Sequence, residues 1–322
     1  MSESPPPPSP TWSIASLANS AVQFLRLPVL ASSGLAVVAS GLLGVSKCYF
    51  VPNKTSEMIY PRNIPVDART NVPSPRDFGV TDFEDLQIPT PDGESLHALF
   101  LRQPKGRAAR NLTVMMFHGN AGNIGHRVPI GKIIQQTLQC NVLMVEYRGY
   151  GRSTGTPDEA GLRIDAQTGL EYLRQRPETR DNKFVIYGQS LGGAVAIYLT
   201  ATNQEEGDIA GLILENTFLS IRKLIPSIIP PARYIARFCH QNWGSEDMLP
   251  KITKIPILFL SGLKDEIVPP SHMAQLFDLC KAETKVWRTL PNGAHNDSVA
   301  EPGYFDHIHS FISEKVNTDA KS

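Results

Sequence analysis

A serine between glycines, Gly188-Gln-Ser190-Leu-Gly192, follows the short apolar run 184–187 and precedes the helix-forming run 194–200. An apolar run of this length is typical of a buried strand. The small residues around Ser190 allow a sharp turn from strand to helix, which would raise the hydroxyl above the end of the strand. Free N–H groups at the start of that helix would face an oxyanion. The pattern predicts that Ser190 is a catalytic nucleophile.

A serine nucleophile needs a base that accepts its proton and a carboxylate that orients the base. Asp265 follows the apolar run 257–261, and His295 follows the run Lys285–Leu290, so both lie in polar loops after expected strands. We predict His295 as the general base and Asp265 as its carboxylate, in the chain order nucleophile, acid, histidine. Other acidic residues at strand ends or near the histidine remain alternatives to Asp265: Glu266, Glu215 and Asp297.

A glycine-rich loop, His118-Gly-Asn-Ala-Gly-Asn123, directly follows another apolar run, Leu112–Phe117. Its glycines would let the backbone approach a substrate closely. We predict that the backbone N–H groups of Asn120 and Leu191 form an oxyanion hole, and that His118 supports the loop. The turn after the run 141–147 lacks the Gly-Lys-Ser/Thr of a phosphate loop, and Arg148 is expected to brace it through an ion pair with Asp165.

These loops must be positioned by the elements between them. Apolar runs alternate with amphipathic stretches expected to be helices near residues 126–138, 158–175, 191–203, 270–280 and 299–315. The strands are expected at residues 112–117, 141–147, 184–187, 209–215, 257–261 and 285–290, after a hairpin formed by residues 82–88 and 95–101. Such alternation predicts an α/β fold with a mainly parallel, doubly wound sheet whose ligands bind at the carboxyl ends of the strands.

Composition excludes several other classes of function. Lys and Arg total 31, as do Asp and Glu, so no net charge favours nucleic acid. The four cysteines are far apart and have no metal-ligand spacing, and we expect neither a metal nor an organic cofactor. A disulfide framework is not expected, and Cys140 and Cys280 lie in apolar contexts typical of buried thiols.

The N-terminal region has a different composition from the rest of the chain. Residues 1–26 are rich in proline and serine, as in a disordered tail. Residues 27–46 carry no charge and lie between Arg26 and Lys47, and about 20 such residues span a bilayer. A cleaved signal peptide and a buried helix are the alternatives. We predict a transmembrane anchor over 27–50, a linker over 51–80 and a catalytic domain over 81–322, in a single-pass protein of the endoplasmic reticulum, another endomembrane or the plasma membrane.

The motifs together resemble the α/β-hydrolase superfamily, and more narrowly the membrane-anchored branch of fungal bud-emergence-type proteins with their animal and plant relatives. Three further motifs carry the resemblance beside those above: Tyr147-Arg-Gly-Tyr-Gly151, Glu215-Asn-Thr-Phe-Leu-Ser-Ile221 and Gly293-Ala-His-Asn-Asp297. The similarity covers about residues 80–315 and the N-terminal anchor. It implies the same three catalytic residues, Ser190, Asp265 and His295.

The predicted function is a membrane-held serine hydrolase of esters or thioesters, with acyl-lipid or palmitoyl-protein substrates among those considered. Residues 219–249 lie where this architecture accepts a small cap, and their apolar side chains together with the anchor favour an acyl chain taken from the bilayer. The alternatives are a membrane-held scaffold without chemistry, acting in polarity or trafficking, and a serine peptidase of the same fold.

Overall fold

The computed structural model of the chain describes residues 59–104, 110–228, 234, 236 and 239–316. The expected tail (1–26) and transmembrane anchor (27–50) lie outside these ranges. Within the described ranges, no helix has both the length and the hydrophobicity needed to cross a bilayer.

One eight-stranded sheet forms the centre of the molecule, in the order β1-β2-β4-β3-β5-β6-β7-β8. β2 runs antiparallel to both of its neighbours, whereas all the other pairs are parallel. The mainly parallel sheet and the N-terminal hairpin predicted from the sequence are therefore confirmed. The strands are β1 Phe83–Pro89, β2 Ser95–Leu101, β3 Leu112–Phe117, β4 Asn141–Val145, β5 Lys183–Gln189, β6 Ile209–Glu215, β7 Ile257–Gly262 and β8 Lys285–Leu290.

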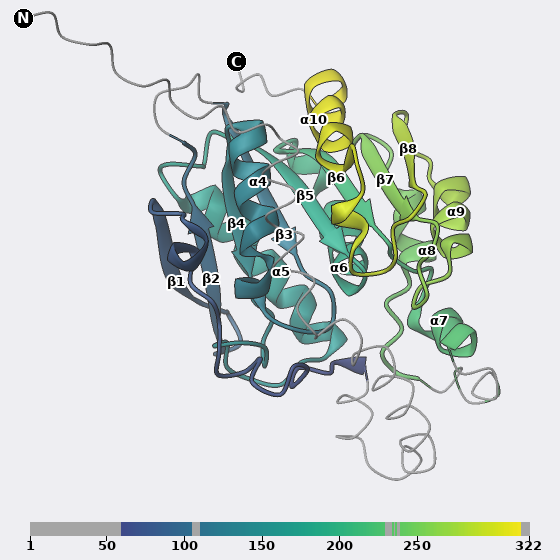
Figure 1. The fold of residues 1–322 in the computed structure, drawn as a ribbon, viewed down its shortest axis with the longest axis horizontal. Helices are drawn as coiled ribbons and strands as arrows, with labels where there is room; N and C mark the ends of the chain where they lie inside the picture. The colour runs from purple at the N-terminus through teal and green to yellow at the C-terminus, as the bar shows by residue number, and fades with distance from the viewer. Residues whose placement is uncertain (1–58, 105–109, 229–233, 235, 237–238, 317–322) are drawn as a thin grey trace, which may run out of the picture.

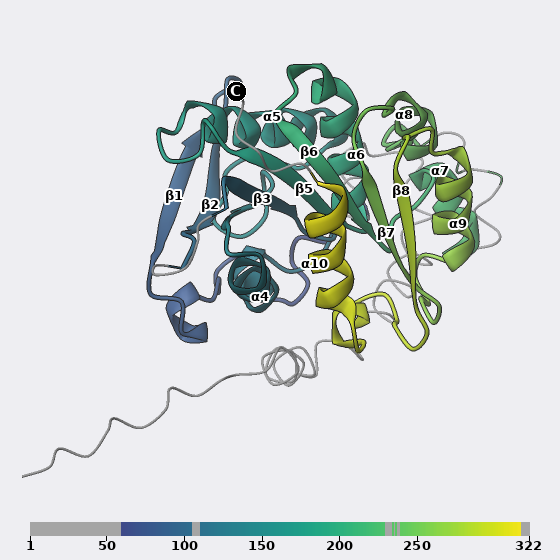
Figure 2. The same ribbon diagram turned by 90° about the horizontal axis from the view of Figure 1, so that it is seen from above.

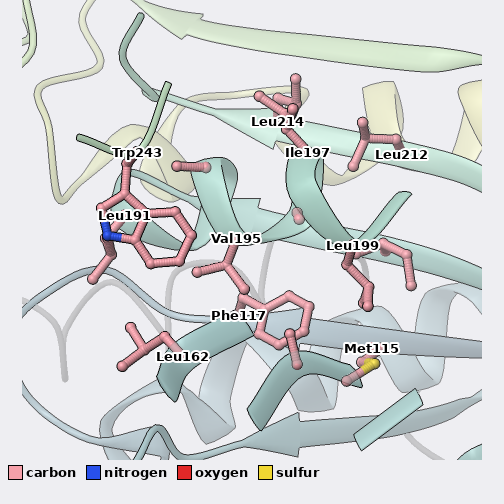
Figure 3. Close-up of a cluster of buried hydrophobic side chains, with 14 of the residues drawn as sticks. Met115, Phe117, Leu162, Leu191, Val195, Ile197, Leu199, Leu212, Leu214 and Trp243 are labelled. Atoms are coloured by element: carbon pink, nitrogen blue, oxygen red, sulfur yellow. The ribbon is translucent and has the colours of Figure 1, made fainter. Parts of the chain in front are cut away.

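Helices cover both faces of the sheet, as Figure 2 shows. α4 (Val128–Leu138) and α10 (Tyr304–Lys315) lie on one face, and α5 (Glu159–Gln175), α6 (Leu191–Asn203) and α9 (Pro270–Leu279) lie on the other. Strands β3, β4 and β7 are buried along their whole length, which explains why their sequences are continuous apolar runs. The two faces have separate hydrophobic clusters, and Figure 3 shows side chains of α6 packed among those of β3 and β6.

Two expected helices are each preceded by a 3₁₀ turn. The helix expected from residue 126 opens with a 3₁₀ turn, η2 (Ile124–Arg127), before α4. The helix expected over 299–315 is divided into η7 (Ser298–Ala300) and α10, because Pro302 and Gly303 interrupt it and Gly303 has a left-handed φ of 83°. The remaining short elements are η1 Pro75–Phe78, η3 Gln204–Glu206, α7 Ile221–Ile228, α8 Ser245–Met248 and η6 Leu249–Lys251.

Residues 59–80 differ from the linker predicted over 51–80. Tyr60 is 1% exposed and belongs to the larger hydrophobic cluster, and Val72 and Val80 are buried in the other one. Residues 60–80 contain no regular strand, and their only helical element is the 3₁₀ turn η1 (Figure 1). The scattered prolines and few apolar pairs of the segment favoured a linker, but the burial of these side chains makes it part of the domain.

Candidate active site

The chain passes from β5 to α6 through Ser190, whose φ of 54° and ψ of −118° are unusual for a residue with a side chain. The glycines on both sides make this turn possible. A Cβ on Gly188 would lie 2.1 Å from the carbonyl oxygen of Gly192, and a Cβ on Gly192 would lie 2.2 Å from the carbonyl oxygen of Phe117. The turn thus has room only for glycine at these positions, and it places Ser190 at the carboxyl end of β5.

The structure brings the three predicted catalytic side chains into one hydrogen-bonded row. His295 Nε2 lies 3.0 Å from Ser190 Oγ, and His295 Nδ1 lies 2.8 Å from Asp265 Oδ2. All three residues are buried, at 6% exposed for Ser190, 8% for Asp265 and 5% for His295. The row has the order nucleophile, imidazole, carboxylate, in which a proton can pass from the hydroxyl to the ring.

Of the four acidic candidates, only Asp265 forms a hydrogen bond with the imidazole ring. Its other oxygen, Oδ1, accepts the backbone N–H groups of Ile267 and Val268 at 2.9 and 2.7 Å, which fixes the carboxylate. Glu266 instead accepts the backbone N–H of His295 at 3.2 Å, and Asp297 accepts that of Ala294 at 2.7 Å. Both therefore shape the histidine loop without touching the ring.

Glu215, the third alternative, lies at the end of β6 and has its own partners. Its Oε2 accepts hydrogen bonds from the hydroxyl groups of Tyr187 and Tyr304. Burial raises the pKa of this carboxyl group, although both hydroxyls and the electrostatic interactions with His295 and Arg127 act in the opposite direction. Glu215 is therefore a buried structural carboxyl group behind the site.

The loop 118–123 lies beside the nucleophile, since a Cβ on Gly119 would be 3.7 Å from Ser190 Cβ. Two buried tyrosines hold its carbonyl groups: Tyr147 donates to His118 O at 2.8 Å and Tyr150 donates to Asn120 O at 2.9 Å. Leu191 is the first residue of α6, where backbone N–H groups lack helical partners. The two residues predicted to form the oxyanion hole thus lie on the loop and the helix that flank Ser190.

His118 supports this loop from beneath, as predicted. Its Nδ1 lies 2.6 Å from Gly119 O and its Nε2 lies 2.9 Å from Glu146 Oε1, and both side chains are almost fully buried. The other oxygen of Glu146 accepts the backbone N–H of Ile124 at 3.0 Å. The predicted ion pair between Arg148 and Asp165 is also present, with Arg148 Nε 2.9 Å from Asp165 Oδ1.

Two residues that the sequence analysis did not identify hold the backbone of His295. Gln189 and Asn216 each donate a side-chain N–H to the carbonyl oxygen of His295, at 3.2 and 3.3 Å. Gln189 is the last residue of β5, and Asn216 directly follows the neighbouring strand β6. Asn216 has a left-handed φ of 46°, which asparagine tolerates better than most residues. The signal available in the sequence was a polar residue at or directly after the end of a core strand.

The described residues contain no group of three or more histidine, cysteine or acidic side chains that could hold a metal. Cys140 and Cys280 are free and buried, and burial raises the pKa of Cys140 to about 12. The predicted burial of Cys140 and Cys280 is confirmed.

Comparisons with known proteins agree with this architecture. Residues 108–252 match the family described as serine aminopeptidase, S33. The chain is 45% identical to the protein Bem46 of Schizosaccharomyces pombe over 91% of this chain and 96% of that one. It is 38% identical to the uncharacterized membrane protein YNL320W of Saccharomyces cerevisiae over 87% and 95% of the two chains.

Solved structures extend the likeness at the level of the fold. An α/β-hydrolase from Vibrio vulnificus superposes with a TM-score of 0.67 at 21% identity, covering 81% of this chain and 94% of that one. An esterase from Pyrococcus furiosus gives a TM-score of 0.62 at 17% identity, covering 75% and 93%.

The fold and the site together define a hydrolase of the α/β-hydrolase class. Within that class, the chain belongs to the Bem46-type family of α/β-hydrolases, as its resemblance to bud-emergence-type proteins suggested.

Proposed function

We propose that this chain is a membrane-anchored serine hydrolase that cleaves carboxylic esters or thioesters through an acyl-enzyme. The observation that carries the proposal is the position of the His295 ring between Ser190 Oγ and Asp265 Oδ2, at 3.0 and 2.8 Å. A buried row of these three groups is the arrangement that activates a serine hydroxyl. The esterase fold of a solved neighbour is consistent with the proposal.

In the proposed reaction, His295 removes the proton from Ser190 as its Oγ attacks the carbonyl carbon of the substrate. The backbone N–H groups of Asn120 and Leu191 receive the resulting oxyanion. His295 then protonates the leaving alcohol or thiol, and the acyl group remains on Ser190. In the second half, His295 takes a proton from water, which attacks the acyl-enzyme. His295 then returns a proton to Ser190 Oγ as the carboxylic acid leaves.

A lipid-derived acyl group is the substrate class we favour. Residues 219–249, the proposed cap, lie between β6 and β7 and contain α7, whose Ile221 and Leu224 are buried against the domain. The proposed anchor at 27–46 would keep this cap near a bilayer, and a relative is called a membrane protein. Extraction of the full-length chain from membranes with carbonate tests the anchor, because a peripheral protein would be released.

Labelling with a fluorophosphonate probe tests the enzyme itself. Wild type should form a covalent adduct on Ser190, and Ser190→Ala should form none. A panel of p-nitrophenyl esters and acyl thioesters of increasing chain length should then show turnover that rises with chain length. No adduct on the wild type would favour the scaffold alternative and reject the proposed function.

A serine peptidase is the second candidate, because the matching family is described as a serine aminopeptidase. Aminoacyl anilides separate the two activities, since a peptidase would cleave them at a substantial rate whereas an esterase would leave them essentially uncut. We expect the esters to be cleaved and the anilides to remain intact.

A further inference from the structure

Residues 59–73, called the arm below, form hydrogen bonds with the loop 118–123 that flanks the nucleophile. The side chain of Asn120 donates to Ile59 O at 3.2 Å, and the backbone N–H of Gly122 donates to Ile64 O at 2.8 Å. Asn123 Nδ2 donates to two carbonyl oxygens of the arm at 2.9 Å each, those of Ala68 and Asn71. The N–H donors of Asn120, Gly122 and Asn123 therefore form hydrogen bonds with backbone carbonyl groups of the arm.

The body of the domain also holds the loop. Tyr147 and Tyr150 donate hydrogen bonds to the carbonyl groups of His118 and Asn120. The loop is thus fixed both by these tyrosines and by the arm. The packing is close, because a Cβ on Gly125, just after the loop, would lie 2.6 Å from Pro73 of the arm.

The arm is itself well anchored to the domain. The hydroxyl of Tyr60 accepts a hydrogen bond from Trp243 Nε1 at 2.9 Å and donates one to Gln241 Oε1 at 2.8 Å. Farther along, the Arg69 guanidinium donates to the carbonyl oxygen of Gly149. Contacts at both ends allow the arm to act as a fixed support for the loop.

We propose that the arm positions the oxyanion-binding N–H of Asn120, and that Asn123 is the main positioning residue between arm and loop. This inference rests on the proposed function, because it assigns the arm a role in that reaction. A displacement of about 1 Å in such a group can cost about 100-fold in rate. Since the proposed anchor precedes the arm in the chain, catalysis would depend on the stretch that joins the anchor to the domain.

The substitution Asn123→Asp removes the bonds from Asn123 to the arm but keeps the side-chain cap that Asn123 provides to η2. Asn123 Oδ1 also accepts the backbone N–H of His126 and thereby caps η2, and an aspartate retains that acceptor. It replaces the Nδ2 donor by a second oxygen, which would face the carbonyl groups of Ala68 and Asn71. We expect kcat to fall about 10- to 100-fold with KM within about 3-fold, and the Gly122 amide to exchange its hydrogen at least about 10-fold faster.

Asn203→Asp in full-length protein is the matched control. Asn203 is 6% exposed, and Asn123 is 1% exposed. Asn203 Nδ2 likewise donates to a backbone carbonyl, that of Leu199, at 2.9 Å. Asn203 is the last residue of α6, at the opposite end of that helix from Ser190. The melting temperatures of both variants are measured, so that a general loss of stability is not mistaken for loss of positioning.

A second variant covers the case in which Asn123→Asp does not fold. Asn120→Ala removes only the bond to Ile59 O and retains the Asn120 N–H, and it should lower kcat about 3- to 10-fold.

The proposal is overturned if kcat of the Asn123 variant matches the control, or if Gly122 exchange is unchanged. A wild type that neither labels with fluorophosphonate nor cleaves any ester would instead reject the proposed function. The exchange measurement would then still decide whether the arm holds the loop.

Discussion

The side chain of Asn216 joins the strand that carries the acid to the loop that carries the histidine. Its Oδ1 accepts the backbone N–H of Gly262 at the end of β7 at 2.8 Å, and its Nδ2 donates to the carbonyl oxygen of His295 at 3.3 Å. Nδ2 also donates to Ser298 Oγ at 2.9 Å. One buried amide therefore links the end of the strand that precedes Asp265 to the backbone of His295.

We expect Asn216→Ala to lower kcat about 10-fold, because the imidazole loses part of its backbone support. Stability should fall by about 1–3 kcal/mol, because the Gly262 N–H is left buried without a partner. Steady-state kinetics and chemical denaturation measure the two effects.

Asn203→Ala removes another buried amide away from the site and is the control for this prediction. It should lower stability and leave kcat near the wild-type value. A kcat for Asn216→Ala no lower than that of the control would contradict the positioning role of Asn216.

Asp265 and Glu266 are adjacent in sequence but contact different atoms of His295, so their substitutions should differ. Asp265→Asn should lower kcat by about 10⁴-fold, because an amide stabilises the wrong tautomer of the ring and cannot compensate its positive charge. Glu266→Gln retains an oxygen that can accept the His295 backbone N–H, and kcat should change less than about 3-fold. Equal losses in both variants would show that the carboxylate was assigned incorrectly.

The strands and the positions of the site residues were predictable because each rests on a local pattern. Continuous apolar runs indicated the core strands, and Ser190 and Asp265 each follow one of them, whereas His295 follows the edge strand β8, whose residues are mostly half-buried or exposed. Parallel strands end at one edge of the sheet, so residues far apart in sequence were expected to meet there.

The contributions of Asn216 and of the arm depend instead on long-range contacts. Asn216 binds residues 46 and 79 positions away in the sequence. The hydrophobic periodicity of the sequence does not predict partners at such separations. The arm is held largely by hydrogen bonds to its backbone carbonyl groups, which every residue type has. Its buried Tyr60 appears in the sequence as an isolated aromatic residue among prolines.

The tight turn around Ser190 makes a further prediction about Gly188. A Cβ there would lie 2.1 Å from the backbone oxygen of Gly192, which cannot move without displacing α6. Gly188→Ala should therefore destabilise the fold by more than about 4 kcal/mol and abolish labelling of Ser190. Soluble yield, melting temperature and fluorophosphonate labelling measure these effects.

Gly207→Ala is the comparison for this variant. A Cβ at Gly207 would meet nothing within 4 Å, although its φ of 71° is unfavourable for alanine. It should cost only about 1–2 kcal/mol and keep full labelling. Normal labelling of Gly188→Ala would show that the turn is less constrained than its geometry indicates.

Glu215 makes stability depend on pH in a direction set by its burial. Its pKa is raised above the ordinary 4.5, so the folded state binds this proton more tightly than the unfolded state does. The stability that the proton contributes is fully present below about pH 4.5 and is lost as the pH rises through the folded-state pKa. Glu215→Gln has no such proton, so its unfolding free energy relative to wild type should increase with pH over this range.

Denaturation of both proteins at several pH values from about 4.5 to 8 tests this, with the exposed Glu206→Gln expected to show no such trend. If the unfolding free energy of Glu215→Gln minus that of wild type stays constant or decreases as the pH rises, the raised pKa is contradicted.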